Sequence, residues 1–423
     1  MSTGHLQQRQ LSRSGGVDFA ALKNDFPFFE RRIDGKRVVY LDSANSAQKP
    51  QVVIDAMSDF LANHYSPVNR SSYRMAAEAN DYFEGARAKV ARFINAPIPE
   101  SVIFTKNATE SLNLVAFSWG KANLGADDAI VLTHMEHHAN IVPWQMLAAE
   151  RHFEIRWIGL TDDGQLDLSN LDELLHGAKA LSFTAMSNVL GTINPVRLLC
   201  DAAHTAGAIA IVDGCQSVPH SPTDVQALGA DLFAFSSHKL LGPTGLGILW
   251  GKPEILEAMP PFQGGGNMIT DVRLDGFTCA EVPHKFEAGT PPIAEAVGLG
   301  AAIDYLSTIG MANVRQHEMA ITQYALDTLS ARFGNDITIY GPSNVELRGA
   351  TLSFAFRGIH PHDISQVLDQ HNVCIRAGHH CAKPLMRVLN AGATARASFY
   401  LYNDEADVDA LADALEAAGD LFM

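Results

Sequence analysis

The feature that most constrains the fold is a regular alternation of two hydrophobic patterns, which begins near Val38. Short runs rich in β-branched and aromatic residues are typical of buried strands, whereas longer amphipathic stretches are typical of helices. The predicted strands span residues 102–105, 129–134, 180–186, 208–214, 231–236 and 247–250. The predicted helices span residues 51–64, 76–93, 111–119, 168–175, 196–204 and 294–306.

This alternation favours an α/β fold, because strands separated by helices pair in parallel and are covered by helices on both faces. After about Ile309 the pattern changes to a long helical segment at 311–333, then apolar runs separated by helices, and a last helix at 405–421. The change predicts two domains. The large one spans residues 41–308, and the smaller α+β domain is formed by residues 17–40 and 309–423.

Composition and charge exclude some classes of binding partner. The chain has 47 acidic residues against 31 basic ones, a formal net charge of −16. Nucleic acids and anionic membranes are bound through basic surfaces, so we expect neither as a partner. The polar residues 1–16, predicted to form a disordered arm, lack the apolar stretch of a secretory signal. Five scattered cysteines without a CxxC motif favour a reducing cytoplasm over a disulfide framework.

Polar side chains follow five of the predicted strands. In parallel sheets, ligands bind at the carboxyl ends of the strands, so these side chains are expected along one edge. Each has an ordinary alternative: a helix cap, a turn residue, a solvated charge or a polar loop. Together with the glycine-rich segment 242–247, however, they suit pyridoxal 5'-phosphate (PLP). The residues are Thr109, His137, Asn188, Asp213, Gln216, Ser236, His238 and Lys239.

The chemistry of PLP gives each group a role. Its aldehyde forms a Schiff base with an amine, which we assign to Lys239. Its pyridine nitrogen must stay protonated to act as an electron sink, which calls for the carboxylate of Asp213. Its phosphate needs several donors near the start of a helix. The remaining predicted cofactor contacts are Gln216 on the ring hydroxyl, His137 stacked on the ring, and Ala108, Thr109, Ser236 and His238 around the phosphate.

Nine segments, in order from about Leu41 to Asn403, carry a resemblance to a known family. They read LDSANSAQKP, NATESLNLVAFSWG, MEHHANIVPWQ, SNVLGT, VDGCQSVPH, FSSHKLLGPTGLGILWG, FEAGTPP, RAGHHCAKPL and RASFYLYN. The chain resembles the class V aminotransferases and, within them, the SUF-type (group II) cysteine desulfurases. The resemblance implies PLP-dependent fold type I and a homodimer. It also implies that Thr290 reaches the phosphate of the second subunit.

The resemblance singles out Cys381 as the residue that accepts sulfur, and the cysteine pattern agrees. Cys200 and Cys374 lie in apolar patterns, and Cys215 beside the cofactor motif is interpreted as packing. Only Cys381 lies in a polar loop rich in glycine and histidine. His379 and His380 are expected to favour its thiolate. A His-His-Cys metal site is the alternative, but no second ligand pair at zinc spacing accompanies it, and we predict no metal.

Two arginines complete the predicted site. The resemblance implies that Arg396 pairs with the substrate carboxylate, assisted by Asn188, and a guanidinium suits this task because it can bind both oxygens. Arg376, five residues before Cys381, is expected to steer the substrate or the loop. The chain departs from the family pattern where relatives commonly carry His-Arg-x-x-His, since Asn69 and Tyr73 replace the two histidines.

The predicted function is therefore a cytoplasmic cysteine desulfurase. L-Cysteine displaces Lys239 from PLP, the freed amine takes the Cα proton, and the Cys381 thiolate attacks the substrate sulfur. L-Alanine leaves, and the persulfide passes to a SufE-like or SufU-like acceptor, with iron–sulfur cluster assembly as the expected pathway. The alternatives are a selenocysteine lyase or an aminotransferase on the same fold, and a non-catalytic subunit for sulfur transfer.

Overall fold

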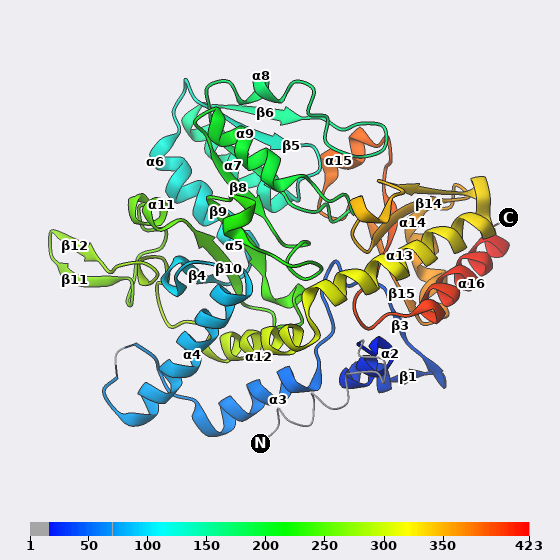
Figure 1. Ribbon diagram of the computed structural model, residues 1–423, viewed down its shortest axis with the longest axis horizontal. Coiled ribbons are helices and arrows are strands. Elements are labelled where there is room, and N and C mark those ends of the chain that lie inside the picture. Colours follow the sequence, from blue (N-terminus) through cyan, green and yellow to red (C-terminus); the bar gives the residue numbers. More distant parts are fainter. Residues whose placement is uncertain (1–16, 70, 423) are drawn as a thin grey trace.

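A computed structural model of the 423-residue chain describes residues 17–69 and 71–422 (Figure 1). The arm predicted at residues 1–16 lies outside the described residues. Within them, no helix is both long enough and apolar enough to cross a membrane.

A seven-stranded sheet forms the centre of the molecule, with the strand order β4-β10-β9-β8-β7-β5-β6. Neighbours from β9 to β6 pair in parallel, whereas β10 is antiparallel to both β9 and β4. The short connection between β9 and β10 explains the reversal, because a parallel crossover needs a dozen or more residues. The bounds are Val102–Thr105 (β4), Ala129–Thr133 (β5), Glu154–Ile158 (β6), Ala178–Thr184 (β7), Ile209–Asp213 (β8), Leu232–Ser236 (β9) and Gly247–Gly251 (β10).

Both faces of this sheet are buried by helices, as the sequence predicts. Successive residues of a strand point to opposite faces: Ile130 and Leu132 pack in one apolar cluster with α5 and α7, while Val131 packs in another with α4, α9 and α12. Continuous apolar runs therefore mark the inner strands. The helices are α3 (Gln51–Asp59), α4 (Arg74–Phe93), α5 (Ala108–Leu114), α7 (Val142–Arg151), α9 (Val196–Thr205) and α12 (Ile293–Ile309), with smaller α6 (Lys121–Asn123), α8 (Leu171–Leu175), α10 (Val225–Leu228) and α11 (Pro253–Ala258).

The C-terminal part forms a second layer of sheet and helices around its own apolar cluster. Its four-stranded antiparallel sheet has the order β13-β14-β17-β16, and Val39 and Leu41 from the N-terminal segment join its core. In Figure 1 this segment lies beside the C-terminal strands. The division into two domains stays a prediction. The elements are α13 (Met311–Phe333), β13 (Ile337–Tyr340), β14 (Thr351–Phe356), α14 (Pro361–Gln370), β15 (Val373–Cys374), β16 (Arg376–Gly378), α15 (Lys383–Val388), β17 (Thr394–Ser398) and α16 (Glu405–Phe422).

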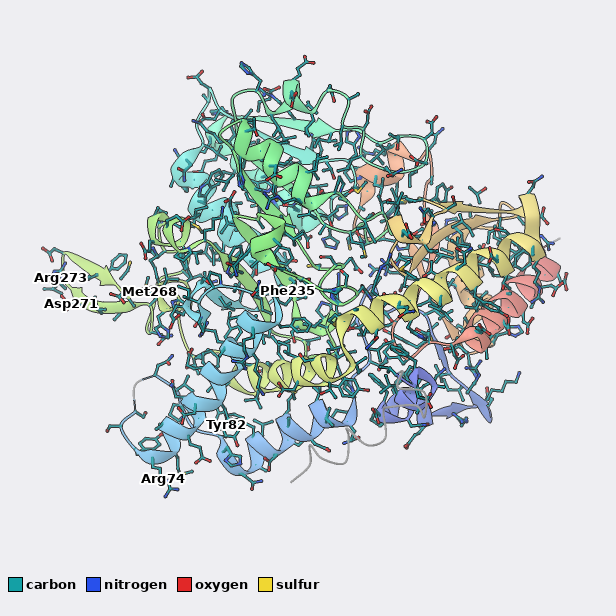
Figure 2. All side chains as sticks on the ribbon, viewed as in Figure 1. Arg74, Tyr82, Phe235, Met268, Asp271 and Arg273 are labelled. Atoms are coloured by element: carbon teal, nitrogen blue, oxygen red, sulfur yellow. The ribbon has the colours of Figure 1, made fainter. Side chains whose placement is uncertain are left out.

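Strand β15 pairs in parallel with β3 (Val39–Tyr40), so the N-terminal segment is joined to the C-terminal part of the chain. Ahead of β3 lie α2 (Phe19–Leu22), β1 (Arg32–Ile33) and β2 (Lys36–Arg37). A separate hairpin of β11 (Ile269–Arg273) and β12 (Gly276–Cys279) stands away from the body, and Figure 2 shows the Asp271 and Arg273 side chains at its outer end.

The predicted strands of the central sheet are all present, with ends that differ by a few residues, but the edge strand β6 was missed. It contains the charged residues Glu154 and Arg156, and only Ile158 is fully buried, so it lacks the continuous apolar run of the inner strands. Helix α5 begins at Ala108 and not at residue 111, because the Asn107 side chain accepts a hydrogen bond from Glu110 N and caps the helix. Thr109 therefore lies within the helix and is not its cap.

Candidate active site

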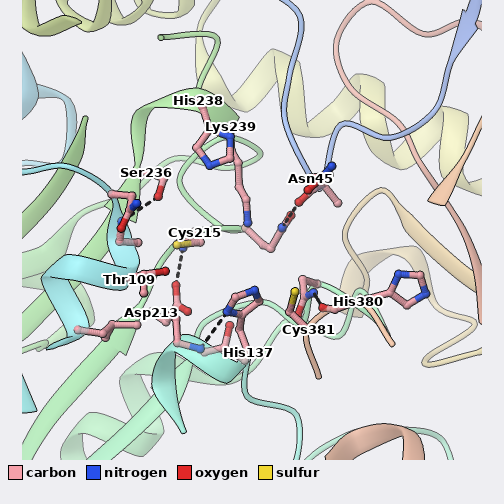
Figure 3. A pocket seen from close by; sticks show the side chains of 18 of the residues that line it. Asn45, Thr109, His137, Asp213, Cys215, Ser236, His238, Lys239, His380 and Cys381 are labelled. Carbon is pink, nitrogen blue, oxygen red and sulfur yellow. Dashed lines mark hydrogen bonds between the residues drawn. The ribbon is translucent and has the colours of Figure 1, made fainter. Parts of the chain in front are cut away.

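A cavity of about 210 Å³ lies at the carboxyl ends of the parallel strands, where the C-terminal sheet meets the central one. Every predicted site residue except Thr290 lines it (Figure 3). In the figure Lys239 enters from one side, Asp213 and His137 lie across from it, and Cys381 lies beside His137. The lining contains Ala108, Thr109, His137, Asn188, Asp213, Gln216, Ser236, His238, Lys239, Arg376, Cys381 and Arg396.

Lys239 ends the short 3₁₀ turn Ser237–Lys239 that follows β9. The turn is fixed through the carbonyl oxygen of His238, which accepts hydrogen bonds from Ala47 N at 3.1 Å and from Lys49 Nζ at 2.9 Å. Burial and the nearby Lys239 charge lower the pKa of His238 to about 4, so its ring is neutral at pH 7. Burial also lowers the pKa of Lys49 to about 7, which places an amine of reduced basicity close to the turn.

One end of the cavity suits a phosphate. Ala108 N, at the start of α5, donates to Ser236 Oγ at 2.9 Å, which joins the helix start to the end of β9. The dipole at a helix start favours an anion, and the hydroxyl groups of Thr109 and Ser236 line the cavity at this place. A Cβ added at Gly247 would lie 2.3 Å from the Asn107 backbone, so a glycine is required where β10 passes this turn.

The opposite end suits an aromatic nitrogen heterocycle. Asp213, at the end of β8, is 3% exposed, and its Oδ1 accepts from Cys215 N at 2.9 Å. Ala139 N donates to His137 Nδ1 at 3.1 Å, so the proton of the neutral ring is placed on Nε2. Burial, and then Lys239, lower the pKa of His137 to about 3. His137 is therefore an uncharged flat ring, as a stacking partner requires.

Glu136, beside His137, is a buried carboxyl group that sequence reasoning did not single out. Its oxygens accept from Thr133 Oγ1 at 2.5 Å, from Thr184 N at 3.0 Å and from Asn140 Nδ2 at 2.7 Å. Burial raises the pKa of Glu136 to about 8 in spite of these donors. The bonds fasten the His137 segment to β7, whose last residue, Thr184, lines the cavity.

Arg376 contacts the Cys381 thiol, with its Nη2 3.7 Å from Sγ. Its guanidinium places a positive charge beside the sulfur. The expectation that His380 supplies that charge is wrong: burial and the two arginines lower its pKa to about 3, so it stays neutral. Cys215 lines the same cavity, but burial and Asp213 raise the pKa of its thiol well above the ordinary range.

Arg396 on β17 is 1% exposed, and only part of its guanidinium is hydrogen-bonded within the protein. Nη1 donates to Asn188 O at 2.8 Å and Nη2 to Asp42 Oδ1 at 3.1 Å, whereas Nε has no hydrogen-bond partner among the described residues. Burial lowers the pKa of Arg396 to about 10, which leaves it charged at pH 7. A buried guanidinium with an unused donor at a cavity wall suits a carboxylate ligand. Asp42 was not predicted from the sequence.

Two predicted features lie away from this cavity. Thr290 lines a separate depression together with Lys106 and Glu110. In the segment that departs from the family pattern, Asn69 Nδ2 donates to Asn267 Oδ1 at 3.1 Å, and Tyr73 Oη accepts from Ser66 Oγ at 3.2 Å.

Comparison with known proteins places this site in a family. The family described as Aminotransferase class-V matches residues 39–411. A probable cysteine desulfurase of Streptomyces coelicolor is 51% identical over 414 residues, covering 96% of this chain and 99% of the relative. A cysteine desulfurase of Haloferax volcanii is 45% identical over 427 residues, covering 98% and 100%. The chain belongs to the class-V aminotransferase family.

Solved structures agree with the sequence comparison. The crystal structure of a cysteine desulfurase of Escherichia coli matches with a TM-score of 0.89 and 37% identity, covering 96% of this chain and all of the other. An apo cysteine desulfurase of Thermococcus onnurineus NA1 matches with the same TM-score and identity, covering 94% and 97%. The predicted family and fold class are confirmed, while the SUF-type subgroup and the residue roles stay predictions.

Proposed function

We propose that this protein is a PLP-dependent cysteine desulfurase, which converts L-cysteine to L-alanine and collects the sulfur as a persulfide on Cys381. The observation that carries the proposal is that Lys239 and Cys381, from distant parts of the chain, line one small cavity. The names of the similar proteins support it.

The described residues fit PLP. Lys239 would hold it through its amine, Asp213 would keep the pyridine nitrogen protonated, and the neutral His137 ring would stack on it. The start of α5 with Thr109, Ser236 and His238 would hold the phosphate, and Gln216 the ring hydroxyl. When bound, PLP accepts the electron pair that remains when the substrate loses its Cα proton.

The chain's own groups perform the other tasks. Arg396 binds both oxygens of the substrate carboxylate with the N–H donors that its two protein contacts leave free, Nε among them, and Lys239 Nζ removes the proton from Cα. The Cys381 thiolate, in contact with Arg376, attacks the substrate sulfur. An S–S bond forms as the Cβ–S bond breaks. The electron pair of the broken bond stays with the substrate carbon, and a proton completes the methyl group of alanine.

Partners and assembly belong to the same proposal. The persulfide passes to a SufE-like or SufU-like protein in the cytoplasm, and iron–sulfur cluster assembly receives the sulfur. The enzyme works as a homodimer in which Thr290 contacts the phosphate of the second subunit. The distance of Thr290 from its own cavity supports this arrangement, and so do the exposed apolar residues Val272 and Phe277 on the β11–β12 hairpin.

The test is a measurement of products. Purified protein loaded with PLP is given L-cysteine, and alanine and protein-bound persulfide are both quantified, with and without a candidate acceptor. Equal amounts of alanine and persulfide in a single turnover are expected. Alanine faster than persulfide under all conditions, or neither product, would contradict the proposal. The same measurement with L-selenocysteine as substrate distinguishes a cysteine desulfurase from a selenocysteine lyase.

Replacement of Arg396 by lysine tests the carboxylate site. Lysine keeps the charge but cannot bind both oxygens, so we expect KM for L-cysteine to rise about ten- to a hundredfold. The visible absorbance of bound PLP should be unchanged, because Arg396 is assigned to the substrate. Arg332→Lys on the surface of α13 is the matched control. An unchanged KM in Arg396→Lys would remove Arg396 from the site.

A further inference from the structure

We propose that His380 is a positioning residue, whose buried imidazole anchors the loop that presents Cys381 to the start of β17. The inference rests on the proposed function, because it takes Cys381 as the sulfur acceptor. His380 precedes Cys381 directly, so an anchor at this position acts on the nucleophile through one peptide bond.

The loop has a backbone that needs external support. His380 and Cys381 have φ angles of 51° and 56°, and Gly378 has a φ of 129°. The left-handed region is unfavourable for residues with a Cβ, and two such residues in succession persist only where their surroundings hold them. The contacts of His380 are therefore part of what determines where the thiol lies.

The imidazole makes the contact on the inner side of the loop. His380 is 2% exposed, and its Nε2 lies 2.8 Å from Thr394 Oγ1 and 3.1 Å from Thr394 O, at the start of β17. On the other side, His138 N donates to Cys381 O at 2.7 Å. His138 Nε2 in turn accepts from Lys383 N at 2.9 Å, just after the loop. The loop is held between β17 and the segment that follows His137.

The charge of the ring fits an anchor and not an acid or base. Burial, Arg396, Arg376 and His379 lower the pKa of His380 to about 3, against a smaller opposite effect of Thr394. A neutral ring protonated on Nε2 donates to Thr394 O without bringing a further cation beside the arginines. The positive charge beside Sγ is that of Arg376.

Asn188 connects the loop to the carboxylate site. Its side-chain Nδ2 donates to His380 O at 2.8 Å, and its backbone oxygen accepts from Arg396 Nη1 at 2.8 Å. Two hydrogen bonds through one residue thus join the guanidinium that binds substrate to the peptide that carries the nucleophile. Because this link uses the backbone oxygen of His380, replacement of the side chain should displace Cys381 while Arg396 and the cofactor contacts stay in place.

The experiment compares His380→Gln with His380→Asn in the PLP-loaded enzyme. The amide nitrogen of glutamine reaches about as far as Nε2 and can still donate to Thr394, whereas asparagine is too short. We expect kcat to fall roughly ten- to a hundredfold in His380→Asn, as for a nucleophile displaced by about 1 Å. KM and PLP absorbance should stay within about twofold, and His380→Gln should recover most of kcat. His362→Asn, at an exposed histidine of α14, is the control.

A second readout does not depend on turnover. The rate of Cys381 alkylation by iodoacetamide is measured against pH by mass spectrometry. Because His380→Asn moves the thiol away from Arg376, its alkylation profile should shift to higher pH, while that of His380→Gln should match the wild type. If wild type makes no alanine, the proposed function fails, yet this profile still tests the anchor.

Two results would overturn the inference. One is His380→Asn with wild-type kcat and a wild-type alkylation profile. The other is equal loss in His380→Asn and His380→Gln together with lowered melting temperatures, which would show that the imidazole only fills space in the core.

Discussion

We expect Lys239→Ala to lose nearly all alanine formation from L-cysteine. The substitution removes both the amine that holds PLP and the base that takes the Cα proton. A positioned general base alone contributes about 10²- to 10⁴-fold to the rate. Because Lys239 also holds the cofactor, we expect the rate of alanine formation to fall by at least about a thousandfold. The measurement is alanine release by the purified protein supplied with excess PLP, together with the visible absorbance of the protein after removal of free cofactor.

Two further variants make the result specific. Lys239→Arg keeps the positive charge in the cavity but cannot link to an aldehyde or act as a base near pH 7, so it should be as inactive as the alanine variant. Lys179→Ala, at an exposed residue of β7, should behave like wild type. Substantial turnover in Lys239→Ala would show that another residue supplies the catalytic amine. Lys49, with its lowered pKa, would then be the first residue to replace.

The site residues that could be predicted from the sequence are those that follow a strand. Asp213, Ser236 and Lys239 come directly after buried runs, and parallel strands bring their ends to one edge. Their assembly in one cavity was therefore predictable from hydrophobic pattern alone. The Lys239 turn illustrates the limit of that reasoning. It is held by Ala47 and Lys49, nearly two hundred residues earlier in the chain, and no local pattern indicates that contact.

Electrostatic details were the least accessible to sequence reasoning. His380 next to Cys381 suggests a charged histidine beside a thiol, but its charge depends on burial against β17, which only the packing of the C-terminal sheet determines. Asp42 likewise looks like an ordinary polar residue of a loop. It becomes the carboxylate partner of Arg396 because β3 pairs with β15 and brings the N-terminal segment to the cavity wall.

Cys381→Ser separates sulfur removal from every step that precedes it. Serine keeps the size and polarity of the side chain but provides no thiolate to attack the substrate sulfur. We expect alanine formation from L-cysteine to fall by at least about a hundredfold, with no persulfide at residue 381 and normal PLP absorbance, because the cofactor contacts do not involve Cys381. The measurement combines alanine quantification with mass spectrometry of the intact protein after a brief reaction with cysteine.

The matched control is Cys279→Ser on β12, the same substitution at a partly buried thiol outside the cavity, which should leave both products unchanged. The prediction also discriminates between activities of this family, since an aminotransferase does not need a cysteine nucleophile. Full alanine formation by Cys381→Ser would show that the C–S bond breaks without transfer to this residue. Arg376, which contacts Sγ, would then be assigned to substrate binding. In that case an Arg376→Lys variant would raise KM for L-cysteine and leave the alkylation profile of Cys381 unchanged.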